Sequence, residues 1–212
     1  LTIYRAPHLR TSILRNRSGE ESFSPGPEIL VTKTASQPDV RVATPTPFQA
    51  DSRRESRDEL AARLLAAYRT VRDETERRAA PLSPEDQLIQ SMPDASPAKW
   101  HRAHVTWFWE QFLLGEHSPG YTPYHPDYAY LFNSYYVSAG PRHARAQRGH
   151  LTRPGADEVT AYRKHVDAAV AAFFNTADET TLAKLEPLIE VGLNHEQQHQ
   201  ELMLTDILHA FA

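Results

Sequence analysis

Two histidines one helical turn apart are the residues best suited to chemistry in this 212-residue chain. They are His195 and His199, in the segment Asn194-His195-Glu196-Gln197-Gln198-His199. Side chains four positions apart on a helix lie on one face, so both imidazoles can reach a single metal ion. The segment lies in an apolar helical pattern, and buried histidines need partners. We therefore interpret the pair as metal ligands rather than as polar residues on a solvated face.

The same segment fits the H-E-x-x-H pattern of zinc hydrolases, in which the glutamate, here Glu196, activates water. No third ligand follows at a spacing familiar from that class, so we look for one on another helix. Trp100-His101-Arg102-Ala103-His104 offers two histidines. His104 shares a helical face with Trp107, whereas His101 lies toward its edge, and we expect the loss of His101 to matter little. Three histidine ligands leave about three coordination positions open, as suits a redox or Lewis-acid metal.

Other polar side chains are placed to bind a substrate. Arg142, Arg145 and Arg148 follow at intervals of three and form a local basic patch. Two interpretations stay open for this patch: a solvated basic surface, or a carboxylate site, because guanidinium groups bind carboxylates through two parallel hydrogen bonds. Gln198 lies between the two histidines of its segment and would point beside the metal, where it can donate to a bound substrate.

These residues need elements to position them, and the apolar periodicity predicts four helices. The first starts at Ser52 and runs for about 25 residues. The second is expected from Ala98 to Leu114, with Ser96 as N-cap, Pro97 in the first turn and Gly115 as terminator. The other two are expected at Asp157–Phe174, capped by Asp157, and at Thr181–Phe211.

Two stretches fall outside this helical pattern. Residues 1–50 contain six prolines and no sustained period, which predicts a disordered leader. Residues 116–154 are too long for a simple connection unless they have a function, so they are the predicted functional loop. The expected fold is thus all-α: a four-helix bundle over residues 51–212 with one long crossover loop.

Composition excludes several classes of protein. A net charge of −4 provides no global field for nucleic acid, and no apolar run approaches the length of a membrane span. The absence of cysteine excludes disulfides, thiolate metal sites and a cysteine nucleophile. We therefore expect a cytoplasmic protein with no nucleic-acid or membrane partner, whose metal chemistry uses histidine and carboxylates.

A series of motifs in order along the chain resembles one family. Over about residues 55–212 the sequence resembles the N-terminal DinB-like domain of ergothioneine-biosynthesis sulfoxide synthases, also called hercynine oxygenases. The motifs are Leu82-Ser83-Pro84-Glu85-Asp86-Gln87, Ser91-Met92-Pro93-Asp94-Ala95-Ser96-Pro97, Trp100-His101-Arg102-Ala103-His104, Tyr130-Leu131-Phe132-Asn133-Ser134-Tyr135-Tyr136, Gly140-Pro141-Arg142-His143 and His195-Glu196-Gln197-Gln198-His199-Gln200-Glu201-Leu202.

The resemblance implies a DinB-like four-helix bundle that holds non-haem Fe(II) through three histidines, His104, His195 and His199. In that family, iron and O2 join a thiol, γ-glutamylcysteine or cysteine, to the imidazole of hercynine and oxidise the sulfur to a sulfoxide. Gln198 matches a position that contacts hercynine. Arg142 and Arg145 match positions that hold the carboxylates of the thiol, and Arg148 offers an alternative register.

Family members continue into a second domain, similar to formylglycine-generating enzymes, that supplies an active-site tyrosine. That domain is absent from this chain, so the resemblance implies no catalytic residue here and poor turnover by the chain alone. Two alternatives remain open. One is a DinB-like, divalent-metal, thiol-dependent transferase or isomerase, and the other is a zinc hydrolase using His195-Glu196-x-x-His199.

Overall fold

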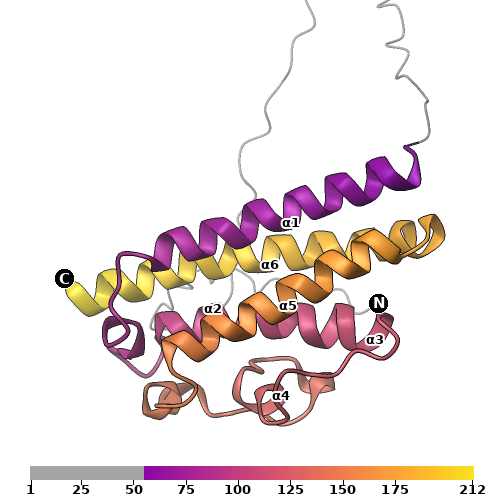
Figure 1. The fold of residues 1–212 in the computed structure, drawn as a ribbon. Helices are drawn as coiled ribbons and strands as arrows, with labels where there is room; N and C mark the ends of the chain where they lie inside the picture. Colours follow the sequence, from indigo (N-terminus) through magenta and orange to yellow (C-terminus); the bar gives the residue numbers. More distant parts are fainter. Residues whose placement is uncertain (1–54) are drawn as a thin grey trace, which may run out of the picture. The chain divides into compact units, whose positions relative to one another are not determined.

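Four long helices form a bundle in the computed structural model, which describes residues 55–212 (Figure 1). The predicted leader, residues 1–50, lies outside the described residues. No strand occurs in residues 55–212, so the all-α expectation is confirmed. The helices of the bundle are α1 (Arg57–Ala79), α2 (Ala98–Phe108) with its continuation, α5 (Ala156–Thr176) and α6 (Glu179–Phe211).

The long crossover between the second and third of these helices is also present, and it contains short helical pieces. They are α4 (Tyr128–Leu131), η3 (Val137–Ala139) and η4 (Arg145–His150). Trp100 of α2 donates to the carbonyl of Leu131, and Tyr128 packs edge-on against Tyr162 of α5. The crossover therefore lies against α2 and α5, on the side of the bundle away from α1 (Figure 1). A further short piece, η1 (Asp86–Leu88), connects α1 to α2.

The helix starts differ from the predicted ones by a few residues. Ser56 caps α1 through a capping box with Glu59, so the helix begins at Arg57, a few residues after the predicted start. Pro97 occupies the N-cap position of α2 without a side-chain bond, and the hydroxyl of Ser96 instead accepts from Arg148. Gly155 rather than Asp157 precedes α5. Periodicity identifies a helix well but does not fix its terminal residues.

The predicted stop at Gly115 is wrong. The helix continues from α2 through a π-helical segment, η2 (Trp109–Leu114), into α3 (Gly115–His117). Within η2, Glu110 accepts hydrogen bonds from the hydroxyls of Tyr121 and Tyr162, both at 2.7 Å. These bonds tie the widened turn to the start of the crossover and to α5.

The core between the helices is rich in aromatic rings, among them those of Trp107 and Trp109. Both of these tryptophans are buried, and Trp109 packs edge-on against Tyr68 of α1 at 5.0 Å between ring centroids. Gly192 of α6 lies so close to Trp109 that a Cβ there would come within 2.5 Å of the indole ring. This close approach packs α6 against η2. It thereby fixes the position of His195 and His199, which follow on α6, relative to the helix that carries His104.

Candidate metal centre

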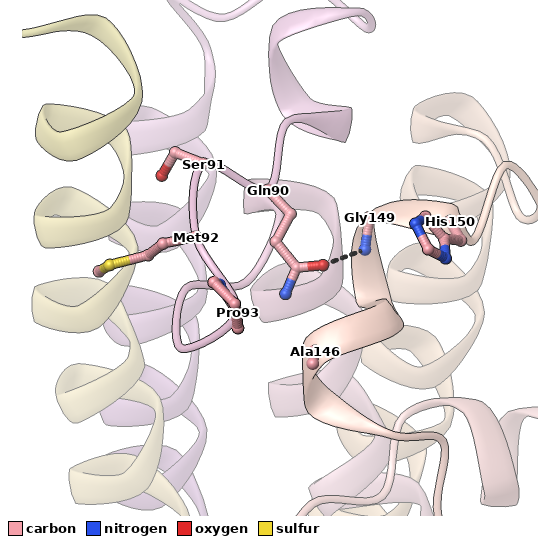
Figure 2. Close-up of a pocket in the computed structure, with 7 residues that line it drawn as sticks. All are labelled: Gln90, Ser91, Met92, Pro93, Ala146, Gly149 and His150. Atoms are coloured by element: carbon pink, nitrogen blue, oxygen red, sulfur yellow. Dashed lines mark hydrogen bonds between the residues drawn. The ribbon is translucent and has the colours of Figure 1, made fainter.

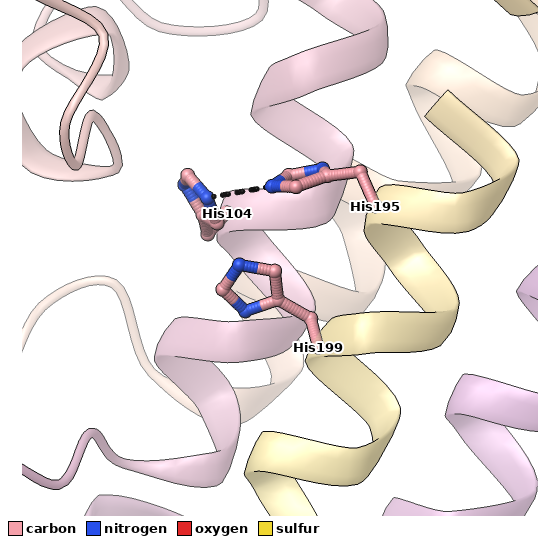
Figure 3. Close-up of side chains that lie close together, drawn as sticks. All are labelled: His104, His195 and His199. Carbon is pink, nitrogen blue, oxygen red and sulfur yellow. Dashed lines mark hydrogen bonds between the residues drawn. The ribbon is translucent and has the colours of Figure 1, made fainter. Parts of the chain in front are cut away.

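The three histidines predicted as ligands converge in space. His104 comes from α2, and His195 and His199 come from consecutive turns of α6 (Figure 3). One ring nitrogen from each lies within 4.8 Å of the others, and the Nε2 atoms of His104 and His195 are 3.1 Å apart. The arrangement brings three potential donor atoms to one point between two helices.

All three imidazoles are neutral at physiological pH. Burial lowers the pKa of each ring, with a further contribution from neighbouring histidines for His104 and His199. The pKa of His195 falls to about 4 because of burial. A neutral imidazole keeps a lone pair for a metal, whereas a protonated one has none, so these rings are in the state that ligation requires.

The ring of His104 is packed between two aromatic rings and hydrogen-bonded at Nδ1. It stacks on Trp100, with the centroids 4.6 Å apart, and on Trp107 at 5.4 Å. Its Nδ1–H donates to the carbonyl of Phe132 at 2.5 Å. This bond places the proton on Nδ1 and leaves the Nε2 lone pair directed at His195, which is the usual outer contact of a metal-binding histidine.

The donor set fits a divalent transition metal. Three neutral imidazoles suit Fe(II), Co(II), Ni(II) or Zn(II) better than the hard cations Mg²⁺ and Ca²⁺, which prefer oxygen. A cation between His104 and His195 would satisfy two Nε2 atoms that otherwise face each other at 3.1 Å. His104, His195 and His199 are therefore the residues that would hold the metal.

His101 lies closer to this centre than its expected place at the edge of the helix face. Only 3% of the residue is exposed, and its Nδ1 lies 2.9 Å from Nδ1 of His199. The expectation that His101 is dispensable therefore lacks structural support. Asp206 also belongs to the surroundings of the centre, since its carboxylate bonds Nε2 of His101. The sequence spacing already places both residues on the helix faces of the ligands, because His101 precedes His104 by three residues and Asp206 follows His199 by seven.

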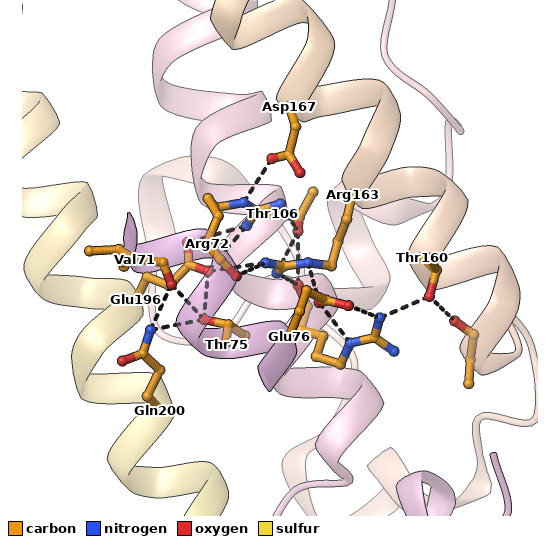
Figure 4. Close-up of polar contacts among 12 residues, drawn as sticks. Val71, Arg72, Thr75, Glu76, Thr106, Thr160, Arg163, Asp167, Glu196 and Gln200 are labelled. Atoms are coloured by element: carbon orange, nitrogen blue, oxygen red, sulfur yellow. Dashed lines mark hydrogen bonds and ion pairs between the residues drawn. The ribbon is translucent and has the colours of Figure 1, made fainter. Parts of the chain in front are cut away.

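Glu196, the neighbour of His195 in the sequence, points into a buried ionic network with side chains of α1 and α5 (Figure 4). Its carboxylate is fully buried and accepts from Arg72 at 3.2 Å, Arg163 at 3.3 Å and the hydroxyl of Thr75 at 2.7 Å. Burial alone would raise its pKa, but the two arginines lower the pKa to about 2. A carboxylate held in this way cannot activate a water at the metal, so the geometry contradicts a zinc hydrolase with Glu196 as its base.

A cavity of about 230 Å³ opens beside the centre. Its lining includes the predicted substrate residues Gln198 and Arg145, together with Arg148. The lining residues are Ser96, Trp100, His101, Ser134, Tyr135, Tyr136, Arg145, Arg148, His195, Gln198, His199 and Leu202. Arg142 is not among them: it borders an adjoining hollow, where it donates to the carbonyl of Ser134 and lies over the ring of Tyr135.

Arg148 is the buried cation of this cavity. Its guanidinium lies 3.3 Å from the centroid of the Trp100 ring and donates to the hydroxyls of Ser96 and Ser134. Within residues 55–212 no carboxylate forms an ion pair with it. Burial and the nearby Arg145 lower its pKa to about 9, which still leaves it charged at neutral pH. A buried cation without a counter-ion is typical of an anion-binding site.

Gln90 fixes the short helix that carries these arginines. Its side chain accepts from the backbone N–H of Gly149 at 2.6 Å and donates to the carbonyl of Arg145 at 2.8 Å (Figure 2). The amide also donates to the carbonyl of Ala95, just before α2. Through this one side chain η4 is anchored to the chain segment that leads into α2.

The fold and site together define a helical-bundle protein with a histidine centre suited to a divalent metal. Residues 67–203 match the family model of the DinB superfamily, and the chain belongs to that superfamily. All three converging histidines lie inside the matched range. DinB domains typically bind a divalent metal, and many are metal-dependent enzymes. No curated protein matches the chain. Among the described helices, none is long and apolar enough to cross a membrane.

Proposed function

We propose that this chain is the Fe(II)-binding part of an O2-dependent sulfoxide synthase. The reaction joins hercynine to a thiol, γ-glutamylcysteine or cysteine, in ergothioneine biosynthesis. One observation carries the proposal: three converging neutral histidines lie beside a cavity whose wall holds Gln198 and the guanidinium groups of Arg145 and Arg148. The motif series along the sequence supports the same function.

Iron supplies O2 activation and open coordination positions for the imidazole of hercynine and the thiolate. The residues of this chain bind and orient the two substrates around it. Gln198 borders the cavity next to His195, where its amide can hydrogen-bond the imidazole of hercynine. In this proposal the thiol at the metal belongs to the substrate, which is consistent with the absence of cysteine from these 212 residues.

Arg145 and Arg148 are the residues that we propose bind the carboxylates of the thiol. Both line the cavity next to His199, and the Nε–H of each is buried without a hydrogen-bond partner among residues 55–212. A substrate carboxylate would satisfy these donors and neutralise the buried charge of Arg148. Arg142 lies one hollow further out, so the geometry favours Arg145 and Arg148 over the pair Arg142 and Arg145.

The proposal includes a second domain and a place of action. A domain similar to formylglycine-generating enzymes would supply the active-site tyrosine and the remaining wall of the pocket, in the cytoplasm. On this basis the 212-residue chain binds metal and hercynine but produces little or no sulfoxide by itself. Robust sulfoxide production by this chain alone would contradict that part of the proposal.

The test uses the chain loaded with Co(II) or, without oxygen, with Fe(II). Hercynine should change the visible spectrum of the Co(II) protein because its imidazole enters the coordination sphere. γ-Glutamylcysteine should then bind more weakly to Arg148→Met than to the unchanged protein, while hercynine binds equally well to both. O2 uptake by the Fe(II) protein should depend on both substrates, even if it is slow.

A different set of results would favour the DinB-like transferase or isomerase. In that case a thiol would perturb the Co(II) spectrum without hercynine, hercynine would have no effect, and no O2 would be consumed. That outcome would overturn the sulfoxide synthase proposal and leave the metal centre intact.

A further inference from the structure

A chain of three polar side chains leads outward from the histidine centre. Nδ1 of His199 lies 2.9 Å from Nδ1 of His101, and Nε2 of His101 lies 2.9 Å from the Oδ2 atom of Asp206. The same Oδ2 accepts the backbone N–H of Ser96 at 2.8 Å. Asp206 and His199 come from α6, whereas His101 comes from α2. These hydrogen bonds therefore link the two helices that carry the histidines.

The hydrogen-bond partners determine where the protons lie. Oδ2 of Asp206 accepts two hydrogen bonds, one from the backbone N–H of Ser96 and one from the ring of His101, as an ionised carboxylate does. A carboxylate only accepts, so Nε2 of His101 carries a proton. The two Nδ1 atoms, 2.9 Å apart, share one proton, and on His101 that proton would create a buried imidazolium, so Nδ1 of His101 is the acceptor. The remaining proton between the rings is therefore on Nδ1 of His199.

This tautomer leaves Nε2 of His199 as the atom with a free lone pair. Figure 3 shows Nε2 of His199, the ring nitrogen farther from the backbone, pointing toward His104 and His195. His104 reaches the same state through a different partner, the carbonyl of Phe132. Two of the three rings thus have their tautomer set by an outer hydrogen bond, as is usual for histidines that bind metals.

We infer that His101 and Asp206 are positioning residues for the metal centre, which orient His199 and fix its proton on Nδ1. The inference rests on the proposed function only in that it requires the three histidines to bind a metal. His101 acts as the acceptor, and Asp206 holds His101 in its own correct tautomer. Without this pair, His199 is free to rotate or to change its tautomer, and the metal is bound less tightly.

His101 is buried and Asp206 is mostly buried, so water cannot easily replace the hydrogen bonds that they make to each other and to His199. The side chains of His101 and Asp206 are 4% and 13% exposed, so little water is available to replace either partner. In the described part of the chain, the other charged groups near them are the guanidinium groups of Arg145 and Arg148, on η4. Neither arginine can accept a hydrogen bond from His199. His101 is therefore the acceptor that the structure provides for the ring of His199.

The test is the dissociation constant for Co(II), measured by competition with a chromophoric chelator, in four variants. His101→Leu removes the acceptor and should weaken binding about 10- to 100-fold, the usual effect of losing an outer partner. His101→Asn places an amide oxygen near the position of Nδ1 and should restore most of that affinity. His199→Ala removes a ligand and should bind least, while His143→Leu, outside the cavity lining, should leave affinity unchanged.

A second measurement needs no substitution. In the Zn(II)-loaded protein, long-range ¹⁵N–¹H correlation spectra should show His199 protonated at Nδ1 and bound to the metal through Nε2. Binding through Nδ1 would overturn the inference, and so would equal affinities of the unchanged protein and His101→Leu. Equal losses in His101→Leu and His101→Asn would also overturn it, because only packing would then matter. If the unchanged protein binds no metal, the proposed function itself fails.

Discussion

Two adjacent residues of α6 have opposite surroundings. His195 faces the cavity and the other two histidines, whereas Glu196 faces α1 and α5. Consecutive residues of a helix point about 100° apart, so one turn of α6 serves both the metal centre and the core. The H-E-x-x-H spacing is therefore compatible with a glutamate that never meets the metal.

Replacing Glu196 by glutamine should destabilise the fold and leave metal binding intact. The change leaves Arg72 and Arg163 as buried cations without their shared carboxylate, which typically costs about 3–5 kcal/mol. Urea denaturation should show this loss, and metal analysis should still find one Co(II) per folded chain. Glu201→Gln, on an exposed position of the same helix, is the control and should change neither quantity. Loss of metal from a folded Glu196→Gln variant would contradict the assignment.

Because Glu196 is ionised in the folded protein, we expect the free energy of unfolding to depend on pH. The pKa of Glu196 in the folded protein is about 2, below its ordinary value of 4.5, because the arginines outweigh the effect of burial. Its contribution is therefore complete above about pH 5 and is lost as the pH falls toward 2. Thermal unfolding of the metal-free protein between pH 2 and 5 should show unchanged protein and Glu196→Gln converging as the pH falls. A constant gap would contradict this linkage.

Gly192 controls how closely α6 approaches η2. A Cβ at this position would meet Trp109 at 2.5 Å and Phe108 at 2.9 Å. Trp109 cannot easily move aside, because it is buried and its Nε1 donates to Glu196 at 3.2 Å. Gly192→Ala should therefore reduce the free energy of unfolding by about 1–3 kcal/mol, as overpacking does. Glu190→Ala, at an exposed position nearby, should have little effect in the same denaturation experiment.

Gly149 of η4 lies against Gln90, the side chain that anchors this short helix. A Cβ on Gly149 would lie 2.7 Å from Cβ of Gln90, so Gly149→Ala should displace the segment that carries Arg145 and Arg148. The histidines lie on α2 and α6 and should be unaffected. We expect the variant to bind Co(II) as the unchanged protein does and to bind γ-glutamylcysteine several-fold more weakly. Calorimetry with each ligand separates the two effects, and equal weakening of both would show that η4 also supports the metal.

The elements that sequence predicted well are those with a long, regular pattern. Four helices, the crossover at 116–154 and the pairing of His104 with His195 and His199 follow from periodicity, helix spacing and the motif series. The π-helical segment η2 could not be predicted, because its residues Trp109–Leu114 continue the helical pattern of α2 and carry no signal for a wider turn. Sequence alone does not distinguish Arg148 from Arg142 and Arg145, because its burial depends on a contact with Trp100. Trp100 lies on α2, far from Arg148 in the sequence, and local spacing does not reveal such a contact.

At the scale of the whole molecule, the metal centre joins two distant parts of the chain. His104 and His195 are 91 residues apart, and α2 and α6 meet at their histidines. A metal bound there closes a long loop that the unfolded chain leaves open, so binding free energy adds to folding free energy. The network around Glu196 ties α1, α5 and α6 together without metal (Figure 4), so the bundle has a second support. The metal-free protein is therefore expected to be folded but less stable.

Metal binding should accordingly raise the melting temperature of the protein without creating its helices. At a free Co(II) concentration 100 times the dissociation constant, the stabilisation should be about 2.7 kcal/mol. Far-UV circular dichroism should show equal helix content with and without metal below the transition, and a chelator should reverse the shift. His199→Ala should lose the shift, and Mg²⁺ should cause none in any variant, because three imidazoles are poor ligands for a hard cation. A metal-free chain without helical signal would instead show that the centre is required for folding. A shift that persists in His199→Ala would place the stabilising metal elsewhere in the chain.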